Sequence, residues 1–156
     1  MQTKLELFEE VYQANSSKVS AAIEALATQG SIERRGAVFT RIEVVDFILD
    51  LAGYTEDQPL HLKRILEPSF GGGDFLFPIV DWLLAAWKNA KVMETVVGGL
   101  GDAIRAVELH RETFATTRLA IIERIRREGI EIQSATALAD RWLIQGDFLL
   151  SPPEGR

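Results

Sequence analysis

Apolar residues recur along the chain in short continuous runs and in longer stripes at helical spacing. The short runs, at 64–67, 103–109 and 141–145, have the length and composition of buried strands. Stripes with helical period predict helices over 41–52, 74–87 and 111–127. Strand and helix alternate, which is typical of an α/β fold with a parallel sheet. We therefore expect a Rossmann-like half sheet of three parallel strands with right-handed crossovers and helices on both faces.

The remaining segments are expected to connect or cover this sheet. Two apolar stripes within residues 1–30 predict a helical N-terminal segment that serves as a packing layer or lid, ahead of a single domain over 31–156. The glycine-containing stretch 91–101 is expected to be a connection with an extra half-helix, and 135–141 a loop or short turn. Thr40 and Glu43 have the Thr-x-x-Glu spacing of a capping box, so Thr40 is expected to cap the helix that follows it.

The chain is organised around the stretch 64–76, in which an apolar run ends at Glu67-Pro68 and Gly71, Gly72 and Gly73 precede a helix. Glycines allow positive φ angles and close approach of a ligand to the backbone, and a helix start leaves free N–H groups at the turn. This arrangement predicts a nucleotide-type binding loop. Taken alone, the glycine turn leaves a dinucleotide as a possible ligand.

Each predicted strand delivers a carboxylate at its end: Glu67, Glu108 and Asp147. In a parallel sheet these ends lie at one edge, where ligands bind, and Glu108 is placed to accept hydrogen bonds from two ribose hydroxyls. Carboxylates suit a ligand rich in hydroxyl and amino donors and suit a pyrophosphate badly. Two alternatives stay open: Glu108 as a solvated strand-end residue, and Thr40 as either a simple cap or an anion-holding residue at a helix start.

The amino-acid composition limits the kinds of partner that the chain is expected to bind. With 17 Lys and Arg against 23 Asp and Glu, the net charge is −6, which argues against a surface that holds nucleic acid by itself. The chain has no cysteine and two histidines, so neither a disulfide framework, a thiolate metal site nor a histidine cluster is expected. It also has no apolar run long enough for a signal peptide or a membrane span. We expect a soluble, cytoplasmic protein without a metal.

Four elements in a fixed order resemble the N-terminal half of S-adenosylmethionine-dependent N6-adenine DNA methyltransferases. They are the Gly-Ala-Val-Phe-Thr segment at 36–40, the glycine loop at 66–76, Ala-Val-Glu at 106–108 and Gln-Gly-Asp-Phe-Leu at 145–149. The order, with Phe-Thr ahead of the glycine loop, looks like the gamma arrangement that is common in restriction-modification enzymes. The resemblance covers residues 31–150.

The resemblance implies S-adenosylmethionine as the cofactor and assigns its contacts. Those to the methionine, amino-acid and ribose portions are Phe39, Thr40, Glu67, Pro68, Gly71, Gly72, Gly73, Phe75 and Glu108. Those to the adenine end are Leu109 and Phe148 against the ring and Asp147 on the N6 amino group.

Three features depart from the family pattern. Arg41 stands where the family usually has proline after the threonine, and the stretch 91–101 is an insertion relative to a minimal unit. The Asn/Asp-Pro-Pro-Tyr catalytic element is absent, and Ser151-Pro152-Pro153 is followed by Glu154 instead of an aromatic residue. No catalytic residue is therefore assigned, and the chain alone is expected to bind the cofactor without transferring its methyl group.

Two alternative functions share parts of this pattern. An RNA or small-molecule methyltransferase would use the same glycine loop and Glu108, and a non-catalytic domain would use the half sheet for assembly. The first strand is left with one unpaired, apolar edge, which suggests self-association, a covering partner, or a chain truncated before the catalytic element. DNA contacts are expected from regions absent from this chain.

Overall fold

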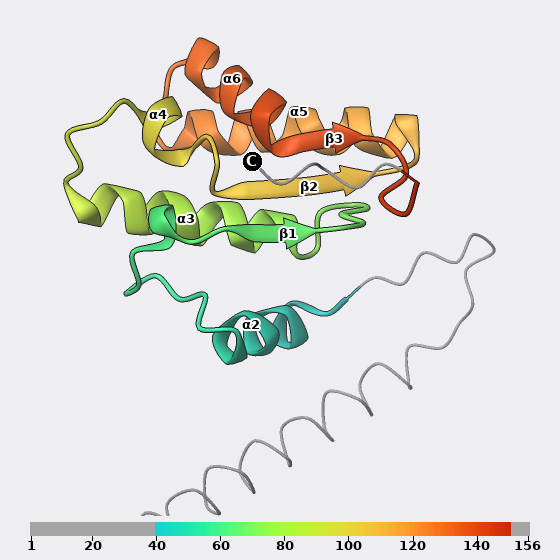
Figure 1. Ribbon diagram of the computed structural model, residues 1–156, viewed down its shortest axis with the longest axis horizontal. Coiled ribbons are helices and arrows are strands. Elements are labelled where there is room, and N and C mark those ends of the chain that lie inside the picture. The colour runs from blue at the N-terminus through green and yellow to red at the C-terminus, as the bar shows by residue number, and fades with distance from the viewer. Residues whose placement is uncertain (1–39, 151–156) are drawn as a thin grey trace, which may run out of the picture.

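The computed structural model describes residues 40–150 of the 156-residue chain (Figure 1). The predicted N-terminal helical segment and Phe39 lie outside the described residues. The elements in order are α2 (Ile42–Leu51), the 3-10 turn η1 (Leu60–Leu62), β1 (Ile65–Glu67), α3 (Leu76–Ala90), α4 (Val96–Leu100), β2 (Ile104–Glu108), α5 (Arg111–Arg127), α6 (Ile132–Trp142) and β3 (Leu143–Gln145).

The three strands form one parallel sheet in the order β1-β2-β3. Ile65 pairs with Ile104, and Ala106 pairs with Leu143, so β2 lies in the centre. Helices surround the sheet, and Figure 1 shows α3 and α5 running behind it. The expected Rossmann-like α/β fold of three parallel strands is confirmed. Among residues 40–150, β1 pairs with β2 alone, which leaves its other edge without a strand.

The core lies between the sheet and the helices that connect its strands. The apolar stripe of α3 is buried as predicted, through Leu76, Ile79, Val80, Leu83 and Leu84. Helix α5 packs on α3, α6, β2 and β3. Three residues that the helical stripes of the sequence predict in the core are exposed instead: Ile48 of α2 is 42% exposed, Ala52 directly after α2 is exposed, and Leu119 of α5 is 65% exposed. Leu119 lies outside the buried arc of α5, which is centred on Ile121 and Ile125.

The capping role predicted for Thr40 is wrong. Helix α2 has Arg41 as its N-cap, and no side chain caps it. The other end of α2 closes as expected: Gly53 adopts φ +66°, and the N–H groups of Gly53 and Tyr54 donate to the carbonyls of Asp50 and Leu49. This is the Schellman pattern, in which a left-handed glycine satisfies the last carbonyls of a helix.

The loop or short turn predicted at 135–141 is also wrong, because this stretch belongs to helix α6. Its buried residues are Ala135, Leu138, Ala139 and Trp142, which recur at helical spacing. Trp142 ends the helix, so the third strand starts at Leu143 and not at 141 as expected. The expected half-helix within 91–101 is present as α4.

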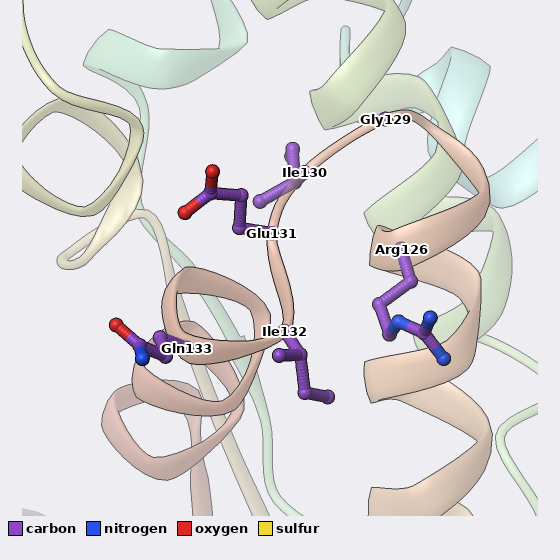
Figure 2. A pocket seen from close by; sticks show the side chains of 6 residues that line it. All are labelled: Arg126, Gly129, Ile130, Glu131, Ile132 and Gln133. Carbon is purple, nitrogen blue, oxygen red and sulfur yellow. The ribbon is translucent and has the colours of Figure 1, made fainter.

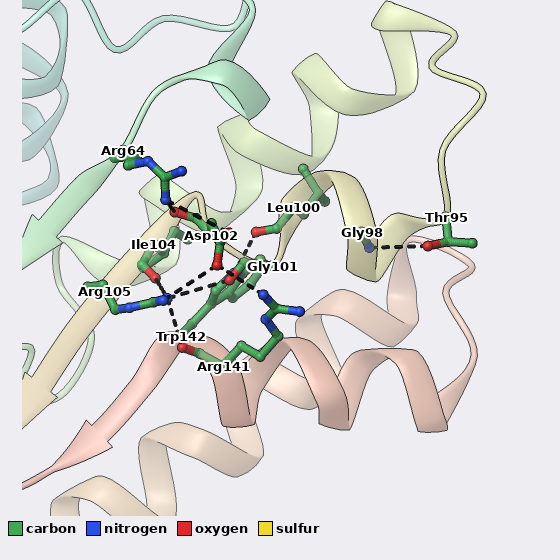
Figure 3. Close-up of polar contacts among 10 residues, drawn as sticks. All are labelled: Arg64, Thr95, Gly98, Leu100, Gly101, Asp102, Ile104, Arg105, Arg141 and Trp142. Atoms are coloured by element: carbon green, nitrogen blue, oxygen red, sulfur yellow. Dashed lines mark hydrogen bonds and ion pairs between the residues drawn. The ribbon is translucent and has the colours of Figure 1, made fainter. Parts of the chain in front are cut away.

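A cluster of arginines around Asp102 ties the amino ends of the strands together (Figure 3). Arg141 donates to Asp102 at 3.0 Å, Arg105 lies 3.5 Å from it, and Arg64 lies within 4.0 Å. The hydrogen bond from Arg141 lowers the pKa of the Asp102 carboxyl, and all three guanidinium charges add to this effect. Arg64 directly before β1, Arg105 of β2 and Arg141 of α6 thus meet at this end of the sheet, opposite the end where the predicted carboxylates lie.

Candidate functional site

The carboxyl ends of the three strands lie at one edge of the sheet, as predicted. Strand β1 ends at Glu67 and β2 at Glu108, whose partner in β3 is Gln145. Pairing of the last two strands continues one step further, because the N–H of Gly146 donates to the carbonyl of Glu108 at 3.0 Å. Asp147 follows directly. This edge is where a parallel α/β sheet places its ligands.

Glu108 is the best-defined residue at this edge. Its side chain is buried, at 3% exposure, yet both carboxylate oxygens have donors. The N–H of Gly71 donates to Oε2 at 2.9 Å, and the N–H of His110 donates to Oε1 at 2.7 Å. A buried carboxylate is stable only when such hydrogen bonds replace water. The structure therefore excludes the solvated strand-end alternative for Glu108 and links it directly to the glycine turn.

The glycine turn has a defined backbone. Gly71 adopts φ +50° and Gly73 adopts φ +98°, so both use conformations that favour glycine. The N–H of Gly73 donates to Phe70, and its carbonyl accepts from Phe77 in the first turn of α3. Gly71 accepts a hydrogen bond from the hydroxyl of Thr117 on α5 at 2.9 Å. Gly72, between them, is exposed.

Gly73 is expected to be the least replaceable glycine of the turn. A Cβ there would lie 2.7 to 2.9 Å from three atoms of the Phe77 ring, and φ +98° is strained for any side chain. We expect Gly73→Ala to cost about 3 kcal/mol of unfolding free energy, the sum of backbone strain and overpacking. Urea unfolding of the variant measures this cost.

Gly71→Ala provides the matched comparison. A Cβ at Gly71 would meet no atom within 4 Å, so its cost is limited to the left-handed backbone, about 1 kcal/mol. Equal losses of stability in the two variants would contradict this account.

The segment before α2 is anchored to the glycine turn. The N–H of Thr40 donates to Oδ2 of Asp74 at 2.8 Å, across 34 positions of sequence. The next residue, Arg41, has φ −62°, which is the angle that a proline ring imposes. Arginine therefore takes the backbone geometry that proline would have there. The backbone of Thr40 is thereby held beside the glycine loop, and its contact with a cofactor stays a prediction.

The other predicted site residues differ in their burial and in their hydrogen bonds. Burial raises the pKa of the Glu67 carboxyl, partly offset by the N–H of Ser69, which donates to it at 3.1 Å. Leu109 is 55% exposed, so an apolar surface lies free beside Glu108. Asp147 accepts from the N–H of Leu149 at 2.9 Å, and Phe148 is half-buried.

Two predicted residues with apolar side chains flank the glycine turn. Pro68 is exposed after β1, and Phe75 is the N-cap residue of α3, where its ring is partly buried against the core. Pro68 and Phe75 can therefore contribute to the shape of a site but donate no side-chain hydrogen bond to a ligand.

The structure has hollows on its surface, and not all of them lie at the carboxyl ends of the strands. One, of about 330 Å³, adjoins the glycine turn and is lined by Gly72, Phe77, Glu112, Thr113, Thr116, Thr117 and Ala120. A slightly larger one, of about 380 Å³, lies at the turn between α5 and α6 (Figure 2). There Arg126 extends to one side of the chain, and Glu131 and Gln133 extend to the other. Because its polar side chains do not converge, we assign no function to this second hollow.

Thr117 and Asp74 are the polar residues of the site that sequence reasoning missed. Thr117 is 3% exposed and stands on the buried stripe of α5 with Ile121 and Ile125. A threonine at an apolar position of a helix is the signal that could have revealed it, since its hydroxyl needs a partner there. Asp74 gave no comparable signal, because its partner is a backbone N–H far away in sequence.

Two searches of the structure were negative over the part that it describes. Residues 40–150 contain no group of three or more His, Cys, Asp or Glu that could hold a metal ion. No helix within this range is long and apolar enough to cross a membrane.

Comparison with known proteins relates the chain to one kind of enzyme. It is 67% identical over 138 residues to the type II methyltransferase M.PaeR7I of Pseudomonas aeruginosa, a match that covers 88% of this chain and 24% of that protein. It is 42% identical over 121 residues to the type II methyltransferase M.XhoI of Xanthomonas vasicola, covering 77% of this chain and 22% of the relative. M.BstVI of Geobacillus stearothermophilus, also a type II methyltransferase, is 36% identical over 126 residues, covering 80% of this chain and 22% of its own length.

The other comparisons gave no match. No protein-family model matches the chain, and no solved structure matches it. The chain spans 22% to 24% of the length of these relatives. On these sequence identities the chain is a homologue of type II methyltransferases that corresponds to about a quarter of their length.

Proposed function

We propose that this chain binds S-adenosylmethionine and is part of a type II DNA methyltransferase of a restriction-modification system, acting in the cytoplasm on the N6 amino group of adenine. The cofactor-binding part is residues 31–156, behind a helical segment at 1–30. The observation that carries the proposal is the buried Glu108 carboxylate, which joins the end of β2 to the N–H of the glycine turn.

The chemistry of this edge suits a nucleoside with a free amino acid. Each oxygen of Glu108 accepts one N–H, and a carboxylate oxygen has a second lone pair for a ribose hydroxyl. Glu67 lies on the neighbouring strand, so a pyrophosphate at the same edge would face two carboxylates. This repulsion disfavours the dinucleotide alternative.

The remaining residues are assigned to different parts of the cofactor. Exposed Leu109 and half-buried Phe148 offer apolar surface to the adenine ring, and Asp147 accepts from its amino group. Thr40, held to the glycine turn by Asp74, is assigned to the methionine end. The resemblance assigns Phe39, outside the described residues, to the same end. Glu67, Pro68, Phe75 and the three glycines frame the amino-acid and ribose portions.

The cofactor supplies an activated methyl group on a sulfonium, and this chain contributes its binding and orientation. Transfer to adenine requires the base to leave the duplex and enter a pocket. The family positions that base with an Asn/Asp-Pro-Pro-Tyr element, which the 156 residues do not contain. DNA contacts, including those that read the recognition site, therefore come from other regions of the enzyme.

Calorimetry with S-adenosylmethionine tests the proposal. We expect a Kd on the order of micromolar, about −8 kcal/mol, similar binding of S-adenosylhomocysteine, and no heat with NAD. Absence of binding at millimolar S-adenosylmethionine would refute cofactor binding by this chain.

A methyl-transfer assay on adenine-containing DNA is the second arm of the test. The chain alone is expected to yield no methylated product, since it lacks the catalytic element. Transfer by the chain alone would contradict this assignment of roles.

The open edge of β1 favours a second candidate, a domain that assembles through its sheet. Such a domain needs no cofactor, so binding of S-adenosylmethionine separates the two. Sedimentation in the absence of cofactor shows whether the chain self-associates.

A further inference from the structure

The buried hydroxyl of Thr117 donates a hydrogen bond to the backbone of the glycine turn. Thr117 lies on α5, 46 residues after Gly71, and its Oγ1 donates to the Gly71 carbonyl at 2.9 Å. The N–H of the same glycine donates to Glu108 Oε2, also at 2.9 Å. Gly71 is thus held on both sides, by α5 through its carbonyl and by the end of β2 through its N–H.

Packing does not hold Gly71 in place. A Cβ at this position would meet no atom within 4 Å, so the space beside the residue is open. The preceding residue is anchored differently, because Phe70 is buried and its N–H donates to the Val107 carbonyl at 3.0 Å. Gly72, which follows, is exposed. The left-handed conformation of Gly71 therefore depends on its two hydrogen bonds, and one of them comes from Thr117.

We propose that Thr117 is a positioning residue for the cofactor site, which sets the affinity for S-adenosylmethionine by holding Gly71 against Glu108. This inference rests on the proposed function. Thr117 makes no contact with the cofactor in this account and acts through Gly71. The hydroxyl fixes the Gly71 peptide, the peptide keeps its N–H on Oε2, and Glu108 is thereby oriented before any ligand arrives.

Loss of the hydroxyl frees the turn. In Thr117→Val, whose side chain has nearly the same shape, the Gly71 carbonyl has no donor and the peptide can rotate. The cofactor must then order the turn itself. Since a hydrogen bond of this kind contributes about one factor of ten to an equilibrium, we expect S-adenosylmethionine to bind about tenfold more weakly.

Three variants test the proposal by calorimetry. Thr117→Val is expected to lose about tenfold in affinity, whereas Thr117→Ser keeps the hydroxyl and should bind within about twofold of wild type. Thr136→Val is the matched control, because Thr136 is a half-buried threonine on helix α6 and no contact between it and the glycine turn is among the described contacts. It should leave the affinity unchanged.

Amide hydrogen exchange at Gly71 supplies a readout that a general loss of stability would not reproduce. Exchange at Gly71 should accelerate in Thr117→Val more than exchange in the core of α3, and Thr117→Ser should restore it. If Thr117→Val does not fold, Thr117→Ala removes the same hydroxyl and is compared in its place.

The outcomes separate this inference from the proposed function. Wild-type affinity or unchanged Gly71 exchange in Thr117→Val overturns the role of Thr117, as does failure of serine to restore both. If the wild-type chain binds no S-adenosylmethionine, the proposed function fails and this inference with it. Binding by wild type together with equal binding by Thr117→Val refutes the inference alone.

Discussion

Replacing Glu108 with alanine is expected to abolish measurable binding of S-adenosylmethionine, with a loss of at least about a hundredfold in affinity. The carboxylate accepts from the N–H groups of Gly71 and His110, and in the proposed site it also accepts from the ribose hydroxyls. Its removal leaves two backbone donors without their acceptor and releases the glycine turn from β2. We also expect a loss of about 2 to 3 kcal/mol in unfolding free energy, because hydrogen bonds to charged groups are strong.

Calorimetry measures the affinity and urea unfolding measures the stability. Glu123→Ala is the matched control, because Glu123 is an exposed carboxylate on α5 that does not line the hollow beside the glycine turn. It should bind like the wild type. Glu108→Gln keeps one carbonyl acceptor and should fall between the two. Retention of wild-type affinity in Glu108→Ala would remove the main support for the proposed site.

Replacing Trp142 with alanine should cause the largest loss of stability, about 4 kcal/mol. Trp142 is completely buried at the junction of α6 and β3, and its Nε1 donates to the Leu100 carbonyl at 2.9 Å (Figure 3). The substitution opens a cavity and also leaves that carbonyl without its donor. Because domains of this size are marginally stable, the variant should be largely unfolded at moderate urea concentrations where the wild type is folded.

Circular dichroism during urea unfolding checks this expectation. Trp142→Phe retains most of the ring but loses the N–H, so it should cost about 1 to 3 kcal/mol. Leu119→Ala, at a 65% exposed position, should change stability by less than about 0.5 kcal/mol. A loss below about 1 kcal/mol in Trp142→Ala would contradict the role of Trp142 as the anchor of α6.

Helices and strands could be predicted wherever the spacing of apolar residues followed one clear pattern. Helix α5 has the bounds 111–127 that its sequence predicts, and the strands at Ile65–Glu67 and Ile104–Glu108 lie within their predicted runs. Helix α6 was missed because two of its four buried residues are alanines, which give a weak apolar stripe. Alanine favours a helix although it is only weakly hydrophobic. The tertiary structure was therefore needed to identify α6 as a helix.

The candidate site was predictable in its location and less so in its connections. Parallel strands bring Glu67, Glu108 and Asp147 to one edge, and this follows from the parallel direction of the strands. The contacts that shape the turn join Thr40 to Asp74 and Thr117 to Gly71, over 34 and 46 positions. No local pattern encodes such pairs, because they depend on how α2 and α5 pack around the sheet.

The arginine cluster around Asp102 implies that the two ends of the sheet respond differently to ionic strength. Asp102 and Arg64 are more than half exposed, and mobile ions shorten the reach of exposed charges from about 10 Å at 0.1 M salt to about 3 Å at 1 M. The carboxylate of Glu108 is 3% exposed and is held instead by two backbone N–H groups, so salt screens its contacts less. Added salt should therefore loosen the amino ends of the strands while leaving the glycine turn in place.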